Sequence, residues 1–177
     1  MSNILPLHHI HLSLGAKMIE FGNYLMPLEY NGIINEHLAV RNNVAIFDIS
    51  HMGEFIIKGI NCVEFLQIVT TNDIKSLYPG KAQYSCITNE KGGVIDDIIL
   101  YCLNNNEYLM IVNSANRKKD FDWLSDHLID NVELTDISDD FVLLAIQGPE
   151  SIAIIDKICG TKILYTPFTF IYRNIRD

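Results

Sequence analysis

Three strand-like segments in the centre of the chain constrain its fold more than any other feature. Residues 82–88, 94–103 and 108–112 are rich in β-branched and aromatic side chains. The segments between them, 89–93 (Asn-Glu-Lys-Gly-Gly) and 104–107 (Asn-Asn-Asn-Glu), consist of residues that favour tight turns. Connections this short join neighbouring antiparallel strands. The pattern therefore predicts a three-stranded antiparallel meander.

Helical and strand-like segments are mixed irregularly around this meander. Apolar residues recur at helical spacing in 5–18, 33–43, 62–70, 116–129 and 148–159. Further extended segments are expected at 19–21, 45–57, 132–135 and 141–147, with turns at Gly22-Asn23, Met26-Pro27 and Pro79-Gly80. Because no regular strand-helix-strand repeat is present, we expect an α+β fold, an antiparallel sheet with flanking helices. The 177 residues suffice for one compact domain, or for one domain plus part of another.

Composition argues against several classes of partner. The formal net charge is -9, and Lys and Arg form no long basic stripe, so we expect no nucleic-acid partner. The four cysteines include no Cys-x-x-Cys pair, which argues against a zinc site and favours a reducing compartment. No signal or transit pattern is seen at the start, so the cytoplasm is expected. The apolar runs are far shorter than the roughly 20 residues of a membrane-spanning helix.

The segment Gly92-Gly-Val-Ile-Asp-Asp97 is the sharpest local feature that could carry chemistry. Its two glycines permit a tight turn, and two neighbouring acids follow at the start of an apolar strand. Side chains alternate along a strand, so Asp96 and Asp97 must point to opposite faces. An acid that faces inward needs hydrogen-bond donors or a cationic ligand. The alternative, which the pattern alone favours, is that both acids cap the turn in solvent.

The other polar and aromatic candidates have structural interpretations. We interpret His8-His9-x-His11 as a solvated terminus rather than a metal site, because no carboxylate or cysteine lies at ligand spacing. The basic trio Arg117, Lys118 and Lys119 is most simply solvated on a helix. Tyr84, Tyr101, Tyr108 and Met52 could line a pocket for a flat ligand, and core packing explains them equally well.

Taken as a set, several motifs identify a family. They are Leu14-Gly-Ala-Lys-Met18, Met26-Pro-Leu-Glu-Tyr30, Glu36-His-Leu-Ala-Val-Arg41, Phe47-Asp-Ile-Ser-His-Met52, Gly92-Gly-Val-Ile-Asp-Asp97, Val112-Asn-Ser-Ala-Asn116 and Ala145-Ile-Gln-Gly-Pro149. Their order and spacing resemble the T-protein of the glycine cleavage system, over about residues 5–168. The resemblance implies the amino-terminal part of the ferredoxin-like, folate-binding aminomethyltransferase fold, incomplete over residues 1–177.

The resemblance also implies an activity. A T-protein is an aminomethyltransferase: it transfers the aminomethyl carbon from the lipoyl arm of the H-protein to tetrahydrofolate and releases ammonia. The products are 5,10-methylenetetrahydrofolate and reduced lipoyl H-protein. Carried over by motif, Asp96 would be the catalytic acid beside the reacting folate nitrogens. Met52, Tyr84, Tyr101 and Asn113 would line the folate pocket, and no metal is implied.

The length departs from the family pattern. A full T-protein is about twice as long, and the later Gly-Tyr-Thr-Gly-Glu segment with its pterin-binding glutamate does not occur in this sequence. The leading expectation is aminomethyltransferase chemistry, by this chain alone or after pairing with a separate carboxy-terminal half. The alternative is a truncated, non-catalytic remnant that folds but turns nothing over. A third possibility, a folate-dependent demethylase, would require a flavin domain, and none is visible.

Overall fold

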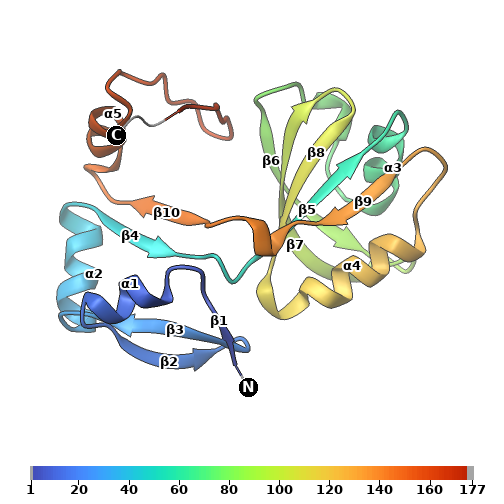
Figure 1. Ribbon diagram of the computed structural model, residues 1–177. Helices are drawn as coiled ribbons and strands as arrows, with labels where there is room; N and C mark the ends of the chain where they lie inside the picture. Colours follow the sequence, from blue (N-terminus) through green and yellow to red (C-terminus); the bar gives the residue numbers. More distant parts are fainter. Residues whose placement is uncertain (1, 175–177) are drawn as a thin grey trace. The chain divides into compact units, whose positions relative to one another are not determined.

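The computed structural model describes residues 2–174, which form two compact units (Figure 1). Unit 1 contains the described residues up to His51, the segment Phe141–Leu164 and the end of the described chain. Unit 2 contains Met52–Asp140 and Tyr165–Tyr172. Each unit is thus assembled from segments that are separated in the sequence.

Unit 2 is built on a five-stranded sheet in the order β6-β7-β8-β5-β9, antiparallel between all neighbours. The strands are β5 (Gly53–Lys58), β6 (Ala82–Thr88), β7 (Val94–Asn104), β8 (Glu107–Val112) and β9 (Glu133–Asp136). The predicted meander is confirmed as β6, β7 and β8, with both turns in the expected places. Gly92 takes a positive φ of 78° in the first of these turns, which explains the glycine there.

Two helices complete unit 2. Helix α3 (Cys62–Val69) follows β5, and α4 (Arg117–Asp126) connects β8 to β9. The strand order β7-β8-β5-β9, with one helix after β5 and the other after β8, is the ferredoxin-like arrangement, to which β6 adds an edge strand. Short 3₁₀ turns occupy Ile74–Ser76, Ser114–Asn116 and Ser138–Asp140. The expected α+β fold with an antiparallel sheet and flanking helices is confirmed.

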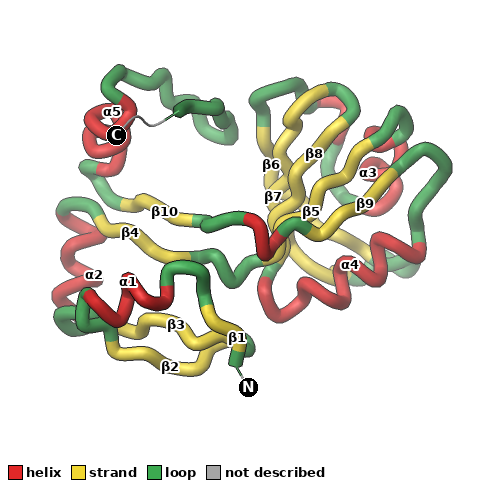
Figure 2. Tube along the Cα trace, viewed as in Figure 1, coloured by secondary structure: helices red, strands yellow, loops and turns green. Residues whose placement is uncertain are grey.

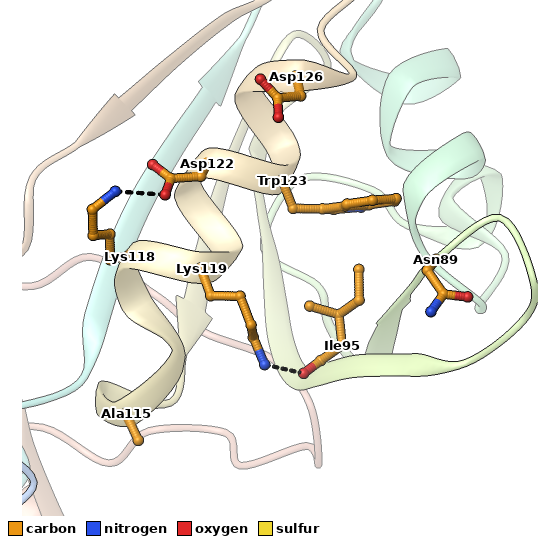
Figure 3. Close-up of a pocket in the computed structure, with 8 residues that line it drawn as sticks. All are labelled: Asn89, Ile95, Ala115, Lys118, Lys119, Asp122, Trp123 and Asp126. Carbon is orange, nitrogen blue, oxygen red and sulfur yellow. Dashed lines mark hydrogen bonds and ion pairs between the residues drawn. The ribbon is translucent and has the colours of Figure 1, made fainter.

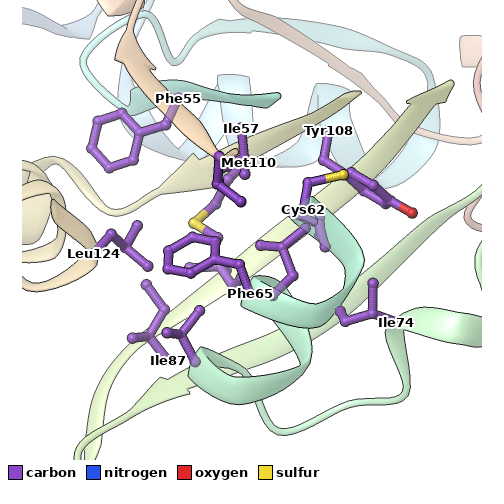
Figure 4. Packing of buried hydrophobic residues seen from close by; sticks show 14 of the residues in the cluster. Phe55, Ile57, Cys62, Phe65, Ile74, Ile87, Tyr108, Met110 and Leu124 are labelled. Carbon is purple, nitrogen blue, oxygen red and sulfur yellow. The ribbon is translucent and has the colours of Figure 1, made fainter. Parts of the chain in front are cut away.

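The core of unit 2 lies between the two helices and one face of the sheet (Figure 4). Phe65 and Leu66 of α3, Leu124 of α4 and Met110 of β8 are all fully buried in it. A side chain of this size contributes about 1.5–3 kcal/mol when it leaves water. Along β7 the even-numbered residues from 96 to 102 are buried and the odd-numbered ones are not, so only one face of this strand joins the core.

Unit 1 contains two small sheets and three helices (Figure 2). Its strands are β1 (Asn3–Ile4), β2 (Lys17–Phe21), β3 (Tyr24–Glu29), β4 (Ala45–Asp48) and β10 (Leu144–Gln147), and its helices are α1 (His8–Ser13), α2 (Ile33–Asn42) and α5 (Ser151–Cys159). Strands β1, β3 and β2 form one sheet, and β10 pairs with β4 in the other. No residue of α2 or α5, both of which lie within the described chain, is buried.

Two expectations about the first sixty residues were wrong. Met26-Pro27 is not a turn but lies inside β3. Lys17 pairs with Glu29 and Met18 with Pro27, so Leu28 forms a β-bulge directly beside the proline. The extended segment expected at 45–57 is two strands, β4 and β5, which belong to different sheets and different units. Whether such a run forms one strand or two depends on which strands it pairs with, and the local sequence does not indicate those partners.

The segment Tyr165–Tyr172 returns to the sheet of unit 2 beside the start of β6. The Ala82 N–H donates to Phe168 O at 2.8 Å, and the Phe170 N–H donates to Gly80 O at 3.0 Å. An isolated β-bridge joins Lys81 to Thr169. The edge at the start of β6 is therefore paired with a segment from much later in the chain.

Candidate functional site

The two acids that end the Gly-Gly-Val-Ile-Asp-Asp segment have opposite environments. Asp96 is 4% exposed, whereas Asp97 on the other face of β7 is exposed. The expectation that one of the two acids faces inward is confirmed, and the alternative that both sit in solvent is wrong for Asp96. Strand alternation causes this difference, since the even-numbered face of β7 is covered by helices.

Asp96 is held by three donated hydrogen bonds. The backbone N–H of Asn113 donates to Oδ2 at 3.0 Å, and the Asn113 and Asn116 amides donate to Oδ1 at 3.0 and 2.6 Å. Burial alone would raise the pKa of Asp96, but hydrogen bonds from Asp120, Asn113 and Asn116 outweigh burial and lower it. Asp96 is therefore a buried carboxylate that is ionised at neutral pH.

Asp97 lies on the open face of β7 beside a tyrosine. The Tyr84 hydroxyl donates to Asp97 Oδ2 at 2.7 Å, and the Asn113 amide donates to Oδ1 at 3.1 Å. The register of β6 and β7 pairs Cys86 with Asp97, which places Tyr84 on the same face. The hydrogen bond to Asp97 is the main reason that the pKa of Tyr84 is raised. One amide, that of Asn113, thus contacts both acids.

Tyr101 and Met52 lie farther from the two acids. Tyr101 is on the same face as Asp97, four residues along β7, which corresponds to roughly 13 Å. Its ring packs edge to face against Phe170 at a centroid distance of 5.5 Å, and burial raises its pKa. Met52 directly precedes β5, whose pairing of Gly53 with Val112 puts Met52 next to Asn113. Hydrogen bonds therefore link Tyr84 to Asn113 through Asp97, and Asn113 to Asp96. Met52 and Tyr101 lie at the margins of this group.

Sequence reasoning missed two members of this group, Asn116 and Asp120. Asp120 lies on α4 and is 0% exposed, and burial and the neighbouring Asp96 carboxylate raise its pKa to about 8. The available signal was the four-residue spacing of Asp120 and Leu124, which places an acid on the apolar face of a helix. Asn116 carried no comparable signal, because asparagine is common at helix starts.

Comparison with known proteins now settles the family. A family model described as the GCVT N-terminal domain matches residues 7–174, nearly the whole chain. The chain belongs to this family. The resemblance drawn from the seven motifs is thereby confirmed.

Individual relatives agree with the family model. An aminomethyltransferase of Bacteroides thetaiotaomicron is 47% identical over 163 residues, which are 92% of this chain and 45% of that protein. One of Chloroherpeton thalassium is 51% identical over 169 residues, which are 93% of this chain and 47% of that protein. The crystal structure of glycine cleavage system aminomethyltransferase T from Bartonella henselae is 34% identical, with a TM-score of 0.85 over 91% of this chain and 44% of that chain. The chain spans about half the length of these GCVT relatives.

In the histidine cluster of this GCVT chain, His9 is exposed, but the interpretation as a solvated terminus is wrong for His11. His11 is 6% exposed, and its ring nitrogens lie 2.8 Å from Asp48 Oδ2 and 2.8 Å from the Tyr30 hydroxyl. Asp48 also accepts a hydrogen bond from the Ser50 N–H at 2.9 Å. The carboxylate partner is thirty-seven residues away in sequence, which is why local spacing did not reveal it. Within unit 1 these contacts join α1 to β4.

Arg117 is also more than a solvated cation. Its guanidinium donates to Asp136 at 2.8 and 3.0 Å and to Asp139 at 3.2 Å. Nearby Glu54 is 4% exposed, and its Oε2 accepts no hydrogen bond from the described residues. Burial raises the pKa of Glu54 to about 7, although Arg117 acts in the opposite direction.

We expect Glu54→Gln to flatten the dependence of stability on pH. Folded wild type keeps a proton on Glu54 between its ordinary pKa of 4.5 and about 7, where the unfolded chain loses it. Wild-type stability should therefore fall as pH rises through this interval, by at most about 1.4 kcal/mol per pH unit. Denaturant unfolding at pH 5, 6, 7 and 8 measures the difference. Parallel curves for wild type and variant would contradict the assignment.

A cavity of about 670 Å³ lies on the α4 side of unit 2 (Figure 3). It is lined by Asn89, Ile95, Ala115, Lys118, Lys119, Asp122, Trp123 and Asp126. Lys119 Nζ donates to Ile95 O at 2.8 Å and Lys118 pairs with Asp122, so both cations are engaged. None of the five predicted site residues lines this cavity, and Tyr84 and Asp97 lie on the other face of β7. We therefore do not place the folate site there.

Neither a metal centre nor a membrane span is found in the described part of the chain. Within residues 2–174, no group of three or more His, Cys, Asp or Glu side chains is arranged to hold a metal ion. No helix in that range has the length and apolar character needed to cross a bilayer.

Proposed function

We propose that this chain provides the two-acid part of a glycine cleavage T-protein. The full reaction transfers the aminomethyl carbon from lipoylated H-protein to tetrahydrofolate, releases ammonia and gives 5,10-methylenetetrahydrofolate. Membership of the GCVT family supports the reaction class. The observation that carries the proposal is the exposed, hydrogen-bonded pair of Asp97 and Tyr84. The Asn113 amide holds Asp97 in place by donating to its Oδ1.

The residues on the open face of β7 suit a folate substrate. Tyr84 is 51% exposed beside the Asp97 carboxylate, and the ring of Tyr101 lies farther along the same face. Aromatic rings can stack on a flat pterin, and a carboxylate stabilises the positive charge that an iminium-like one-carbon unit develops. Elsewhere in the pocket we place Met52 and Asn113, as the family resemblance implies.

The roles of the two acids differ in this proposal. The resemblance assigns the catalytic role to Asp96, and that assignment stays a prediction. Because Asp96 is buried and already accepts three hydrogen bonds, we propose that Asp97 contacts the folate nitrogens. Asp96 would then act indirectly, by orienting the Asn113 amide, which donates hydrogen bonds to both acids. Proton transfer by Asp97 is an added step within the same geometry.

We propose two partners for this half-length chain. One is the lipoylated H-protein, which carries the aminomethyl group. The other is the remaining half of the family's length, on the same or on a separate polypeptide, which would complete the pterin pocket. All four cysteines are unpaired thiols, which supports a reducing compartment such as the cytoplasm.

Calorimetric titration with tetrahydrofolate tests the proposal. We would titrate the purified chain alone and with a homologous carboxy-terminal half supplied in trans, and then assay both samples with aminomethylated H-protein. We expect binding and turnover when the second half is present. Absence of folate binding in both samples would overturn the proposal and favour a non-catalytic remnant.

A further inference from the structure

The carboxyl group of Asp120 is the one fully buried acid of α4. Its side chain is 0% exposed, and among the described residues no N–H or O–H group donates a hydrogen bond to either of its oxygens. An ionised carboxylate without donors or a cation is strongly disfavoured in a protein interior. The neutral, protonated acid is the form that such a site accepts. In that form Asp120 is itself a hydrogen-bond donor.

The acceptor for this proton is Asp96. Asn116 lies directly before α4, one helical turn from Asp120 on the same side of the helix, and its amide donates to Asp96 Oδ1 at 2.6 Å, so Asp120 is brought close to Asp96. Each of the two acids also affects the pKa of the other. Asp96 already accepts hydrogen bonds from Asn113 and Asn116, so its charge is stabilised on one side while Asp120 faces the other. Two carboxylates this close cannot both ionise in a buried site, and one proton shared between them resolves the conflict.

We propose that Asp120 is a positioning residue that keeps a proton at neutral pH and donates it as a hydrogen bond to the Asp96 carboxylate. The pair then carries one proton and one negative charge. Its charge holds the Asn113 amide, which in turn contacts Asp97, the acid that we place against the substrate. This last step rests on the proposed function, whereas the shared proton does not.

Few other charged groups affect the protonation of Asp96 and Asp120. Asp96 comes from β7 and Asp120 from α4, while Asn113 and Asn116 are neutral amides. Lys119 of α4 is the cation that acts on Asp120, and it favours the ionised form only weakly compared with burial. Its ammonium group is engaged by the carbonyl of Ile95 at 2.8 Å. No described residue therefore supplies Asp120 with a hydrogen-bonded counter-ion.

The first test is the pH dependence of stability of the whole chain. With a folded pKa of about 8 against an ordinary 3.8, Asp120 keeps a proton that the unfolded chain releases. Its contribution to stability is therefore lost as pH rises from about 4 to about 8. In wild type this one proton should raise the unfolding equilibrium constant by up to about tenfold per pH unit in this interval. Asp120→Asn, which keeps the shape and an N–H donor, should remove that contribution.

Two controls sharpen this measurement. Asp126→Asn removes an exposed acid from the same helix and should leave the wild-type dependence unchanged. Because Glu54 titrates in an overlapping interval, the Asp120→Asn comparison is repeated in a Glu54→Gln background. An Asp120→Asn variant that retains the wild-type dependence in both backgrounds would refute the shared proton.

Infrared difference spectroscopy gives a direct second readout. At neutral pH, wild type minus Asp120→Asn should show the carbonyl band of a protonated carboxylic acid, and wild type minus Asp126→Asn should not. A purely structural role for Asp120 would produce no such band. Its absence at neutral pH would overturn the proposal.

The positioning role is tested separately in the complemented enzyme. Asp120→Leu, which removes the donor, should lower turnover by about 10–100-fold, and Asp120→Asn should restore most of it. Equal turnover in both variants would refute the positioning role while leaving the shared proton standing. Loss of all turnover in wild type would instead count against the proposed function.

Discussion

Replacing Asp97 by asparagine should lower aminomethyl transfer in the complemented enzyme by about 10²–10⁴-fold. Asparagine preserves the shape of the side chain and can still accept a hydrogen bond from Tyr84, so the fold should be retained. What it removes is the negative charge on the open face of β7, which we propose stabilises the cationic one-carbon unit. Single-turnover measurement with aminomethylated H-protein separates this loss from weaker folate binding.

Asp96→Asn is the matched control for this experiment. It makes the same chemical substitution at the neighbouring acid, which lies on the buried face of β7. There Asn113 and Asn116 donate hydrogen bonds to it. We expect a smaller loss of transfer than for Asp97→Asn. The opposite order, with transfer abolished at Asp96 and retained at Asp97, would return the catalytic role to Asp96 as the family resemblance implies.

Gly59→Ala should produce the largest loss of stability among the glycine substitutions of unit 2. Gly59 has a φ of 141°, and a Cβ there would lie 1.9 Å from the carbonyl oxygen of Asn131. The obstacle is backbone, so the turn after β5 would have to move away from the segment before β9. We expect a loss of about 3 kcal/mol or more in the free energy of unfolding, measured by denaturant titration.

Gly92→Ala isolates the steric part of this effect. Gly92 also has a positive φ, of 78°, but a Cβ there would meet nothing within 4 Å. Alanine should therefore cost only the conformational term, about 1–2 kcal/mol. If the two variants lost the same stability, the close approach of Gly59 to Asn131 would be irrelevant to folding.

Local chemistry made part of the fold predictable. The glycines and asparagines between the central strands predicted the turns. The strand-like segments between those turns predicted β6, β7 and β8. Pairing between distant segments was not predictable in the same way. The division of residues 45–57 between β4 and β5 depends on β10 and β8, which lie far along the chain. Pro27 misled because the β-bulge beside it, at Leu28, exists only through the pairing of β3 with β2.

The candidate site shows the same limit. Alternation along β7 required Asp96 and Asp97 to face opposite ways, but it could not tell which one the helices cover. That depends on which face of β7 joins the core, where Ile98 and Leu100 lie in one buried cluster with residues of α3 and α4. Asp120 could be suspected from its place on the apolar side of a helix. Its proximity to Asp96 is tertiary, as is the pairing of His11 with Asp48.

The interleaving of the two units has a consequence for synthesis on the ribosome. Strand β4 leaves the ribosome early, but its partner β10 follows only after the whole segment Met52–Asp140. The sheet edge at the start of β6 likewise stays unpaired until residues near Thr169 have been synthesised. Both units therefore depend on contacts between residues far apart in sequence, and closing such long loops costs conformational entropy before those contacts form. Vectorial folding is thus delayed, and a nascent chain stalled before residue 141 would expose β4 as an unpaired edge open to misassociation.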